Sequence, residues 1–363
     1  MKKLEIKEND LKNNLNIVKK IIGKNKTEII AVVKANGMGL GLVEYSNFLI
    51  ENGVKILAVA NFEEAITLRK ANIENEIILL SPIIEKKELK LLIENDITLT
   101  ISSLYEYNLI EEIIKENEKN VKAHLKIDTG FGRYGFLYND IKSILQVFNN
   151  SKIEIYGAYT HFSKPINKKW TTLQFNRFMS TVKIIIENGY NIPMLHCCSS
   201  TAFLEYPDMW LDAIRIGSVL QGRTLKKIDG LVKIGKFKTN IVEIKNLPRG
   251  YNISYGNTYK LKKDSKIAII PVGYMDGLNR NKLRDDFSFK NNIISIGMEI
   301  KKVFKNNNIN VRINEKNFKI IGRLGMYHAI IDITNDNNIK IGDEVELNIT
   351  PLQTNDIIRR EYI

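Results

Sequence analysis

The chain has 363 residues, of which 44% are hydrophobic and 26% are charged, and its formal net charge is +13. This composition excludes an intrinsically disordered chain, and the length favours one large domain together with a smaller one. The lysines are scattered among Asn, Ile and Glu, whereas a nucleic-acid-binding protein gathers them with aromatic residues on one segment. We therefore expect no nucleic-acid partner.

The beginning of the chain, MKKLEIKENDL, does not read as a targeting segment, because acidic residues interrupt any apolar region behind its lysines. No stretch approaches the roughly 18 apolar residues that a membrane helix needs. We therefore expect a cytoplasmic protein without a membrane partner. The two cysteines, Cys197 and Cys198, are adjacent, which argues against a structural disulfide between them. They also lack the spacing of a metal site.

The first predicted element is a helix over residues 9–22. Its apolar side chains recur at helical spacing and form one stripe, made of Leu11, Leu15, Val18 and Ile22. Asn9 or Asp10 is expected to cap it, since Asn and Asp side chains accept hydrogen bonds from free backbone N–H groups.

Short apolar runs then recur through the first 220 residues. They are near-continuous in hydrophobicity, as strands buried on both faces are, and segments of helical period such as 104–118 and 170–190 separate most of them. The runs are 29–35, 56–61, 77–82, 99–103, 123–130, 155–162, 194–200 and 213–222. Eight alternations of strand and helix predict a (β/α)8 barrel of the TIM type rather than an open, doubly wound sheet.

The pattern changes after about residue 228 to short alternating stretches separated by turn signals such as NLPRG and NDNN. This pattern predicts an all-β domain. The sequence thus predicts a barrel over residues 1–228, followed by a C-terminal β domain over residues 229–363.

The stretch IIAVVKANGMGLG, residues 29–41, runs from five apolar residues into Lys34 and then into a glycine-rich turn. Lys34 has two interpretations. It could be a strand-end lysine that reaches solvent, or an amine held in a pocket where burial makes it nucleophilic. The residues of this stretch alone leave both open.

The other predicted strands also end in polar or ionisable residues, and in a barrel the carboxyl ends of the strands carry the site. These residues are Lys126, Asp128, Arg133, His161, His196, Ser199, Ser200 and Arg215. Gly217 and Ser218 follow the last strand, where barrels often bind phosphate through backbone N–H groups. A lysine beside a phosphate cradle suggests pyridoxal 5′-phosphate (PLP) held as a Schiff base.

These stretches resemble the alanine racemase family of fold-type III PLP enzymes along nearly the whole chain. AVVKANGMGLG resembles the family's PLP-lysine motif and KIDTGFGRYGF its second motif. The family's order then continues through YTHFS, HCCSSTAF, DAIRIGSVLQG, ISYGNTY, PVGYMDG and IGRLGMYHAIIDIT. The resemblance implies an amino-acid racemase, an isomerase that works as a homodimer with shared active sites.

The resemblance also implies a role for individual residues. Lys34 would be the Schiff-base lysine, and Tyr255, arriving from the partner's β domain, would be the second catalytic group. Arg215 would face the pyridine nitrogen with His196 supporting it, and His161 would orient Tyr255.

The remaining implied roles concern the binding of the cofactor and of the substrate. Ser199, Ser200, Gly217 and Ser218 would bind the cofactor, largely through its phosphate. Arg133 would contact the cofactor oxygen and the substrate carboxylate, with Lys126 beside it as the residue that is carbamylated in many members. Tyr274 and Met326 would contribute to the substrate-binding site. No metal is implied.

Several positions depart from the family's pattern. Met38 and Gln221 stand where tyrosines are usual, Ser199 where asparagine is usual, and Tyr327 where aspartate is usual. Asp356 falls where another phosphate-binding tyrosine is expected. These departures leave open whether the substrate is alanine, serine or a basic amino acid.

Three other functions are alternatives to a racemase. A related PLP barrel decarboxylase carries a cysteine in its β domain, and this chain has none there. A PLP-binding protein without turnover normally lacks the β domain, and a basic nucleic-acid-binding protein would bind no cofactor. For two further polar residues we expect ordinary roles, His124 as a core or network histidine and Asp276 as a turn carboxylate.

Overall fold

The structure is a computed structural model, and it describes residues 1–117, 119–257, 259–280, 293, 297 and 309–363. Its contacts divide the chain into two compact units. One unit comprises residues 8–234, and the other comprises residues 1–7 together with residues 235–363.

The first unit contains a barrel of eight parallel strands. They are β2 (Glu28–Val32), β3 (Ile56–Val59), β4 (Glu76–Leu79), β5 (Leu99–Ile101), β6 (Val121–Asp128), β8 (Ile153–Tyr159), β9 (Met194–His196) and β10 (Ala213–Ile216). Each pairs with its neighbour in this order from β2 to β4 and from β5 to β10, and β10 pairs with β2. A bridge between Ile78 and Thr98 links β4 to β5 and nearly closes the ring, which confirms the predicted (β/α)8 barrel.

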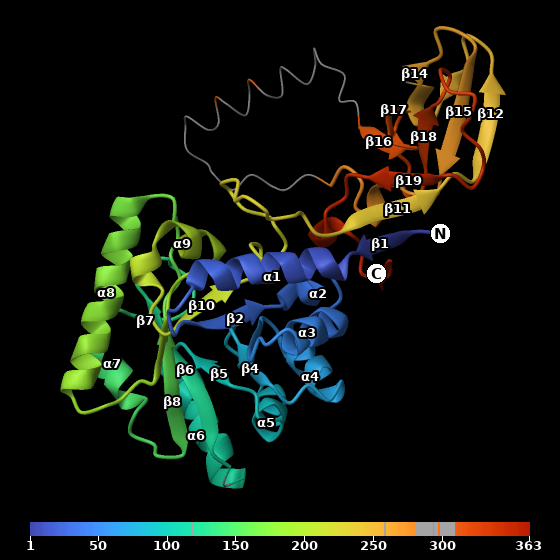
Figure 1. Ribbon diagram of the computed structural model, residues 1–363. Helices are drawn as coiled ribbons and strands as arrows, with labels where there is room; N and C mark the ends of the chain where they lie inside the picture. Colours follow the sequence, from blue (N-terminus) through green and yellow to red (C-terminus); the bar gives the residue numbers. More distant parts are fainter. Residues whose placement is uncertain (118, 258, 281–292, 294–296, 298–308) are drawn as a thin grey trace. The chain divides into compact units, whose positions relative to one another are not determined.

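Helices lie on the outside of these strands (Figure 1). They are α1 (Glu8–Ile22), α3 (Leu42–Glu51), α4 (Phe62–Lys70), α5 (Lys86–Glu94), α6 (Leu104–Asn117), α7 (Ile141–Gln146), α8 (Lys168–Glu187) and α9 (Ser200–Glu205), with a 3-10 turn η1 (Pro207–Met209). The helices predicted over 104–118 and 170–190 correspond to α6 and α8; Glu118 lies outside the described residues.

The predicted stripe of the leading helix is confirmed, because Leu11, Leu15, Val18 and Ile22 are all buried on α1. Its expected cap is wrong, since the helix already begins at Glu8. Asp10 instead lies in the first turn with Glu8, where a negative charge interacts favourably with the helix dipole.

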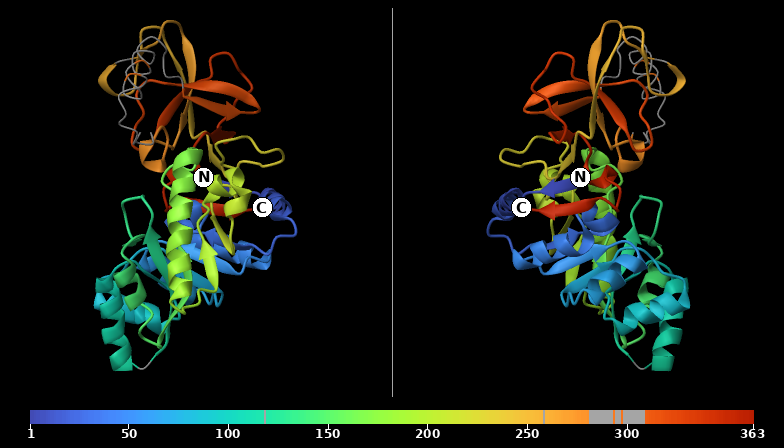
Figure 2. Two further views of the ribbon diagram at one scale, coloured as in Figure 1. Left: turned by 90° about the vertical axis from the view of Figure 1, so that its left-hand side faces the viewer. Right: turned by 90° about the vertical axis from the view of Figure 1, so that its right-hand side faces the viewer.

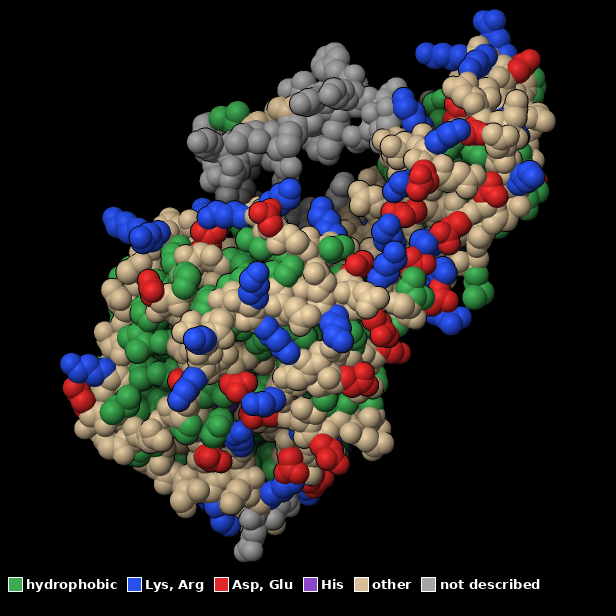
Figure 3. Space-filling view, in the orientation of Figure 1, with side chains coloured by type: hydrophobic (Ala, Val, Ile, Leu, Met, Phe, Trp, Pro, Cys, Tyr) green, Lys and Arg blue, Asp and Glu red, His purple; other side chains and the backbone are tan. Residues whose placement is uncertain are grey.

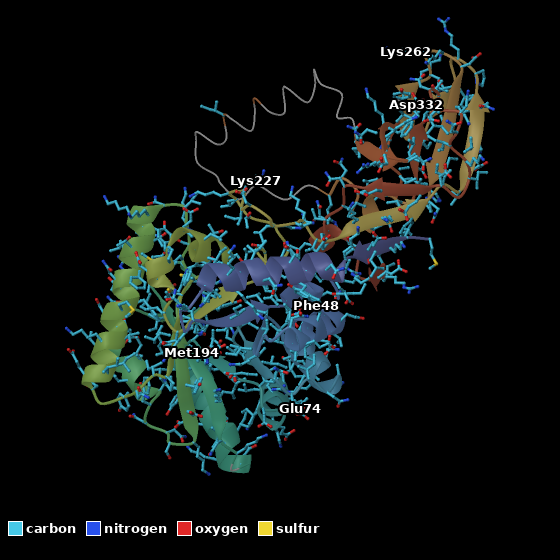
Figure 4. All side chains as sticks on the ribbon, viewed as in Figure 1. Phe48, Glu74, Met194, Lys227, Lys262 and Asp332 are labelled. Atoms are coloured by element: carbon cyan, nitrogen blue, oxygen red, sulfur yellow. The ribbon has the colours of Figure 1, made fainter. Side chains whose placement is uncertain are left out.

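The interior of the barrel is filled by apolar side chains from several strands. One buried cluster consists of Ile30, Ile56, Ala58, Ile78, Met194 and Ala213. Met194, which opens β9, is labelled in Figure 4 with Phe48 of α3. Burial on both faces explains why these strands read as continuous apolar runs in the sequence.

The second unit is a nine-stranded sheet with one separate hairpin. Its strands are β1 (Lys3–Ile6), β11 (Lys236–Asn240), β12 (Glu243–Leu247), β15 (Ser265–Ile270), β16 (Asn310–Ile313), β17 (Lys316–Ile321), β18 (Ala329–Asp332), β19 (Glu344–Leu347) and β20 (Arg359–Tyr362). The order across the sheet is β12-β15-β18-β17-β16-β19-β11-β1-β20, and the hairpin joins β13 (Asn252–Ile253) to β14 (Tyr259–Lys260). An all-β region therefore follows the barrel, as predicted.

Strand β1 belongs to this second unit although it opens the chain. It pairs antiparallel with β11 and parallel with β20, and Figure 2 shows the dark-blue first strand beside the red last one. The compact units accordingly divide between residues 234 and 235, and residues 1–7 lie with the second. That segments 1–228 and 229–363 fold as separate domains stays a prediction.

Among the described residues, none of the helices combines the length and the apolar character needed to cross a membrane. Lys, Arg, Asp and Glu side chains are interspersed on the face of the molecule drawn in Figure 3. Cys197 and Cys198 are buried and unpaired, with their Sγ atoms 3.9 Å apart.

Candidate active site

A cavity of about 380 Å³ opens at the carboxyl ends of the barrel strands. Its lining includes most of the polar residues predicted for the site: Lys34, Lys126, Arg133, His161, Ser199, Ser200, Arg215, Gly217 and Ser218. Four of these side chains are basic, and among the described residues the lining includes no Asp or Glu. The cavity is therefore suited to a small, strongly anionic ligand.

Lys34 stands two residues beyond the end of β2 and opens a short turn, α2 (Lys34–Met38). Ala35, Asn36 and Gly37 within it have left-handed backbone angles, with φ near 55–63°. Only glycine adopts this conformation without steric cost, so the turn must be held by its surroundings.

Two contacts hold that turn. The Asn36 N–H donates to the buried Glu64 carboxylate of α4 at 3.2 Å, and the Asn36 side chain accepts from the Leu42 N–H at 2.9 Å. A Cβ on Gly37 would approach Leu42 and Tyr45 to 3.3 Å, so a side chain there would require these neighbours to move by a few tenths of an ångström. The strained backbone thus sets where the Lys34 side chain leaves the strand.

Arg215 on β10 is buried, and five acceptors surround its guanidinium, the most distant being the Cys197 carbonyl at 3.5 Å. One terminal nitrogen donates to His196 Nδ1 at 2.8 Å and to the His196 carbonyl at 2.9 Å. The other donates to the Thr160 carbonyl at 2.7 Å and lies 3.3 Å from His161 Nδ1. A guanidinium cannot accept a hydrogen bond, so the Nδ1 atom of His196 must be unprotonated.

This assignment continues to a second histidine. With Nδ1 accepting, His196 donates from Nε2 to His124 Nδ1 at 2.8 Å, and His124 carries its own proton on Nε2. Burial lowers the pKa of His124 to about 3, and repulsion from Lys122 and Arg215 contributes to this shift. Burial also lowers the pKa of His196, and repulsion from the charge of Arg215 adds to its effect. The Arg215–His196–His124 chain is therefore neutral beyond the arginine, which confirms His124 as a network histidine.

Tyr159 at the end of β8 also lines the cavity, although it is not among the residues predicted from the sequence. Its ring lies 4.8 Å from the Arg215 guanidinium carbon and stacks on the His196 ring at 4.9 Å. Its hydroxyl donates to the Leu80 carbonyl, and burial raises its pKa to about 12. Tyr159 precedes His161 by two residues and therefore shares its side of an extended chain, a signal that could have identified it.

Lys126 on β6 lies between two aromatic rings. Its Nζ is 5.2 Å from the ring centroids of both Tyr134 and Tyr159. Burial, followed by repulsion from Arg133 and Arg215, lowers its pKa to about 7. Lys126 is therefore poised between its charged and neutral forms near neutral pH.

The loop that carries Arg133 is built around Asp128. The Asp128 carboxylate accepts the backbone N–H groups of Gly130, Phe131 and Gly132 at 2.8–2.9 Å, and that of Arg133 at 3.3 Å. A carboxylate that satisfies four consecutive donors fixes the loop's conformation. Asp128 thus shapes the cavity without lining it.

The opposite side of the cavity is formed by backbone N–H groups and hydroxyls. Ser200 Oγ accepts from the Gly217 N–H at 3.1 Å and from the Val219 N–H at 3.4 Å. A Cβ on Gly217 would lie 3.2 Å from the Val32 carbonyl, so glycine permits close packing against β2. Ser199 precedes α9 as its N-cap residue.

Two of the departures from the family pattern contact each other. The Gln221 side chain, which is fully buried, donates to the Met38 carbonyl at 2.9 Å. Gln221 therefore supports the end of the left-handed turn that begins with Lys34. The structure thus links these two changed positions by one hydrogen bond.

The other predicted site residues lie in the second unit. Tyr255 belongs to the turn η2 (Tyr255–Asn257) and is 70% exposed, and Tyr274 opens the turn η3 (Tyr274–Asp276). Met326 lies between β17 and β18 and is half exposed. Asp276 accepts the Gly273 N–H at 2.9 Å, which confirms it as a turn carboxylate.

Comparison with known proteins shows which family the chain resembles along nearly its whole length. Residues 6–224 match the model of the alanine racemase N-terminal domain, and residues 234–359 match that of the C-terminal domain. The chain is 36% identical to an alanine racemase from Methanococcus maripaludis, covering 94% of this chain and 87% of that protein. It is 35% identical to one from Clostridium perfringens, covering 92% and 82%.

Solved structures give the same result for the fold. An alanine racemase from Clostridium difficile 630 superposes with a TM-score of 0.88 at 28% identity, covering all of this chain and 95% of that one. The chain therefore belongs to the alanine racemase family, and it is a racemase that depends on pyridoxal 5′-phosphate.

Proposed function

We propose that this racemase interconverts L- and D-alanine at the carboxyl ends of its barrel strands, in a homodimer whose two sites are each shared between subunits. The observation that supports the site most strongly is the cavity that Lys34 lines together with three further basic side chains and, within the described part of the chain, no acidic one. The similarity to proteins named alanine racemase supports alanine as the substrate.

The residues around the cavity fit the cofactor. Ser199, Ser200, Gly217 and Ser218 would hold its phosphate through hydroxyl and backbone N–H groups. Arg133 would contact its ring oxygen, and Lys34 would bond to its aldehyde carbon. When bound, the cofactor withdraws electrons from the α-carbon of the attached amino acid, which lets the α-proton leave.

Arg215 would donate a hydrogen bond toward the cofactor's ring nitrogen. Its charge is permanent, so it cannot share a proton with that nitrogen as a carboxylic acid could. The neutral His196, which His124 holds in turn, and the Thr160 carbonyl accept hydrogen bonds from its two terminal nitrogens and fix its plane. With the cofactor bound, this arrangement of Arg215 would limit electron withdrawal by the ring and so would favour return of the proton over transamination.

Racemisation needs one group on each face of the α-carbon. We assign these roles to Lys34 and Tyr255, each of which would accept the α-proton in one direction and donate one in the other. His161 would orient Tyr255. Burial, followed by repulsion from Arg215 and Arg133, lowers the pKa of His161 to about 3, so it would act as a neutral imidazole.

The substrate carboxylate would be bound by Arg133, with Met326 and Tyr274 completing its surroundings. Lys126 would add positive charge beside Arg133. The exposure of Tyr255 supports a role for it toward a second subunit. A cytoplasmic location remains a prediction for cell fractionation to test.

The substrate can be tested with purified protein, added PLP and single L-amino acids, followed by chiral chromatography of the products. We expect D-alanine to form fastest, with less D-serine and little product from L-lysine or L-arginine. Faster racemisation of a basic amino acid would overturn alanine as the substrate. Carbon dioxide release with amine formation would indicate decarboxylation instead.

A further inference from the structure

Lys2, which directly precedes β1, takes part in a partly buried ion pair of the second unit. Its Nζ lies 2.8 Å from Asp276 Oδ1 and 5.2 Å from the centroid of the Tyr327 ring. The Asp276 side chain is 1% exposed, and Lys2 is its one ion-pair partner among the described residues. Loss of the ammonium would therefore leave a carboxylate charge buried without compensation.

Asp276 connects this ion pair to the turn that carries Tyr274. While Oδ1 meets Lys2, Oδ2 accepts the Gly273 N–H at 2.9 Å. The turn η3 closes at Gly277, whose φ of 107° suits glycine. The conformation of residues 273–277 thus depends on a carboxylate whose charge Lys2, alone among the cations that the structure describes, neutralises.

The same turn is packed against the segment that carries Met326. The Tyr274 N–H donates to the Gly325 carbonyl and the Met275 N–H to the Met326 carbonyl, both at 3.1 Å. A Cβ on Gly273 would lie within 2.3 Å of both carbonyl oxygens, so these backbones are in direct contact. Tyr327 follows Met326 in the chain, and its ring is the one that the Lys2 ammonium contacts.

We propose that Lys2 is a positioning residue for substrate binding, acting through Asp276 on Tyr274 and through Tyr327 on Met326. The inference rests on the proposed function, which assigns Tyr274 and Met326 to the substrate. One ammonium neutralises the first segment and contacts the aromatic ring of the second. It thereby fixes the two segments relative to each other.

The geometric part is tested by hydrogen exchange on the full-length holoenzyme. In Lys2→Met, we expect the Gly273, Tyr274 and Met275 amides to exchange about tenfold faster, because the turn opens to hydrate Asp276. Lys3→Met is the matched control, since Lys3 pairs with the partly exposed Glu361, and Glu5, which lies 3.8 Å from Lys3, keeps Lys238 as its closer partner. In Lys2→Met combined with Asp276→Asn, slow exchange should return, because the neutral amide needs no counter-charge.

The functional part is tested by kinetics on the same variants. Lys2→Met should raise KM for alanine about tenfold and leave kcat within about twofold, because ground-state binding is what the two segments provide. Lys2→Arg and the double variant should restore KM, and Lys3→Met should not change it. Global destabilisation alone would lower the active fraction and hence apparent kcat, leaving KM unchanged.

Unchanged amide exchange in Lys2→Met, or faster exchange with unchanged KM, would overturn the inference. A wild-type protein that racemises no alanine would instead refute the proposed function. In that case the exchange experiment still decides whether Lys2 fixes the two segments.

Discussion

Lys34 and Lys126 line the same cavity, but their surroundings differ. The strained turn after β2 directs Lys34, whereas two aromatic rings and two arginines surround Lys126. Four cations close together are mutually repulsive, and a bound anion would relieve that repulsion. At the scale of single residues, the site is therefore organised for anions before any ligand enters.

Lys34 should be the residue that bonds to the cofactor. Lys34→Ala is expected to lose both the visible absorbance of lysine-bound PLP and the racemase activity, because no other amine stands at the end of β2. The exposed Lys55→Ala serves as the control and should keep both. Borohydride reduction that fixes the cofactor to another lysine of wild-type protein would contradict the assignment.

Lys126 should make stability depend on pH in a specific window. Its pKa falls from 10.5 to about 7 on folding, so between these values the unfolded chain binds a proton that the folded one does not. Raising the pH through this window therefore stabilises the folded state. In cofactor-free protein, the unfolding free energy of wild type minus that of Lys126→Met should increase from pH 7 to pH 10.

Urea unfolding at several pH values measures this difference. Both proteins share the other groups that titrate in the window, so subtraction leaves the contribution of Lys126. Parallel curves for the two proteins would show that Lys126 keeps its ordinary pKa on folding.

At the scale of elements, the contact between β6 and β8 decides where the histidine chain lies. The two strands pair with a register shift at Ala123 and His124, and Gly157 stands opposite His124. A Cβ on Gly157 would lie 2.6 Å from the His124 ring, so the missing side chain makes room for the imidazole. A glycine on one strand thus permits the hydrogen bond to His196.

Gly157→Ala should therefore displace His124 and destabilise the protein by about 1–3 kcal/mol, the usual cost of overpacking a core. Urea unfolding measures the loss. The same substitution in a His124→Ala background should cost much less, because the clashing ring is absent. An equal loss in both backgrounds would mean that the clash is not the cause.

The sequence was sufficient to predict the barrel strands but not the connections between distant elements. Eight buried strands leave eight apolar runs, because each must be hydrophobic on both faces. The pairing of β1 with β11 and β20 leaves no such signal, since it depends on backbone groups more than 200 residues apart. The boundary between the two compact units was therefore not predictable from local pattern.

The candidate site likewise has some features that the sequence predicts and others that it does not. Lys34, Arg215 and His161 stand at or near strand ends, where position alone suggests function. The left-handed backbone at Ala35 and Asn36 was not predictable, because neighbouring Glu64 stabilises a conformation that these residue types avoid. The rings around Lys126 were missed because aromatic residues near strand ends are ordinarily part of a core.

At the scale of the whole molecule, the account depends on a second subunit. Lys34 belongs to the compact unit of residues 8–234, and Tyr255 belongs to the other unit. The proposed homodimer places Tyr255 at a partner's cavity, where it would complete the site that contains Lys34.

Subunit mixing tests this claim most directly. Lys34→Ala and Tyr255→Phe should each be nearly inactive, and neither can form a complete site alone. After subunit exchange, random pairing gives half heterodimers with one intact site of two, so activity should recover to about a quarter of wild type. Exchange demonstrated with labelled subunits, but without recovered activity, would show that Lys34 and Tyr255 of one chain serve the same site.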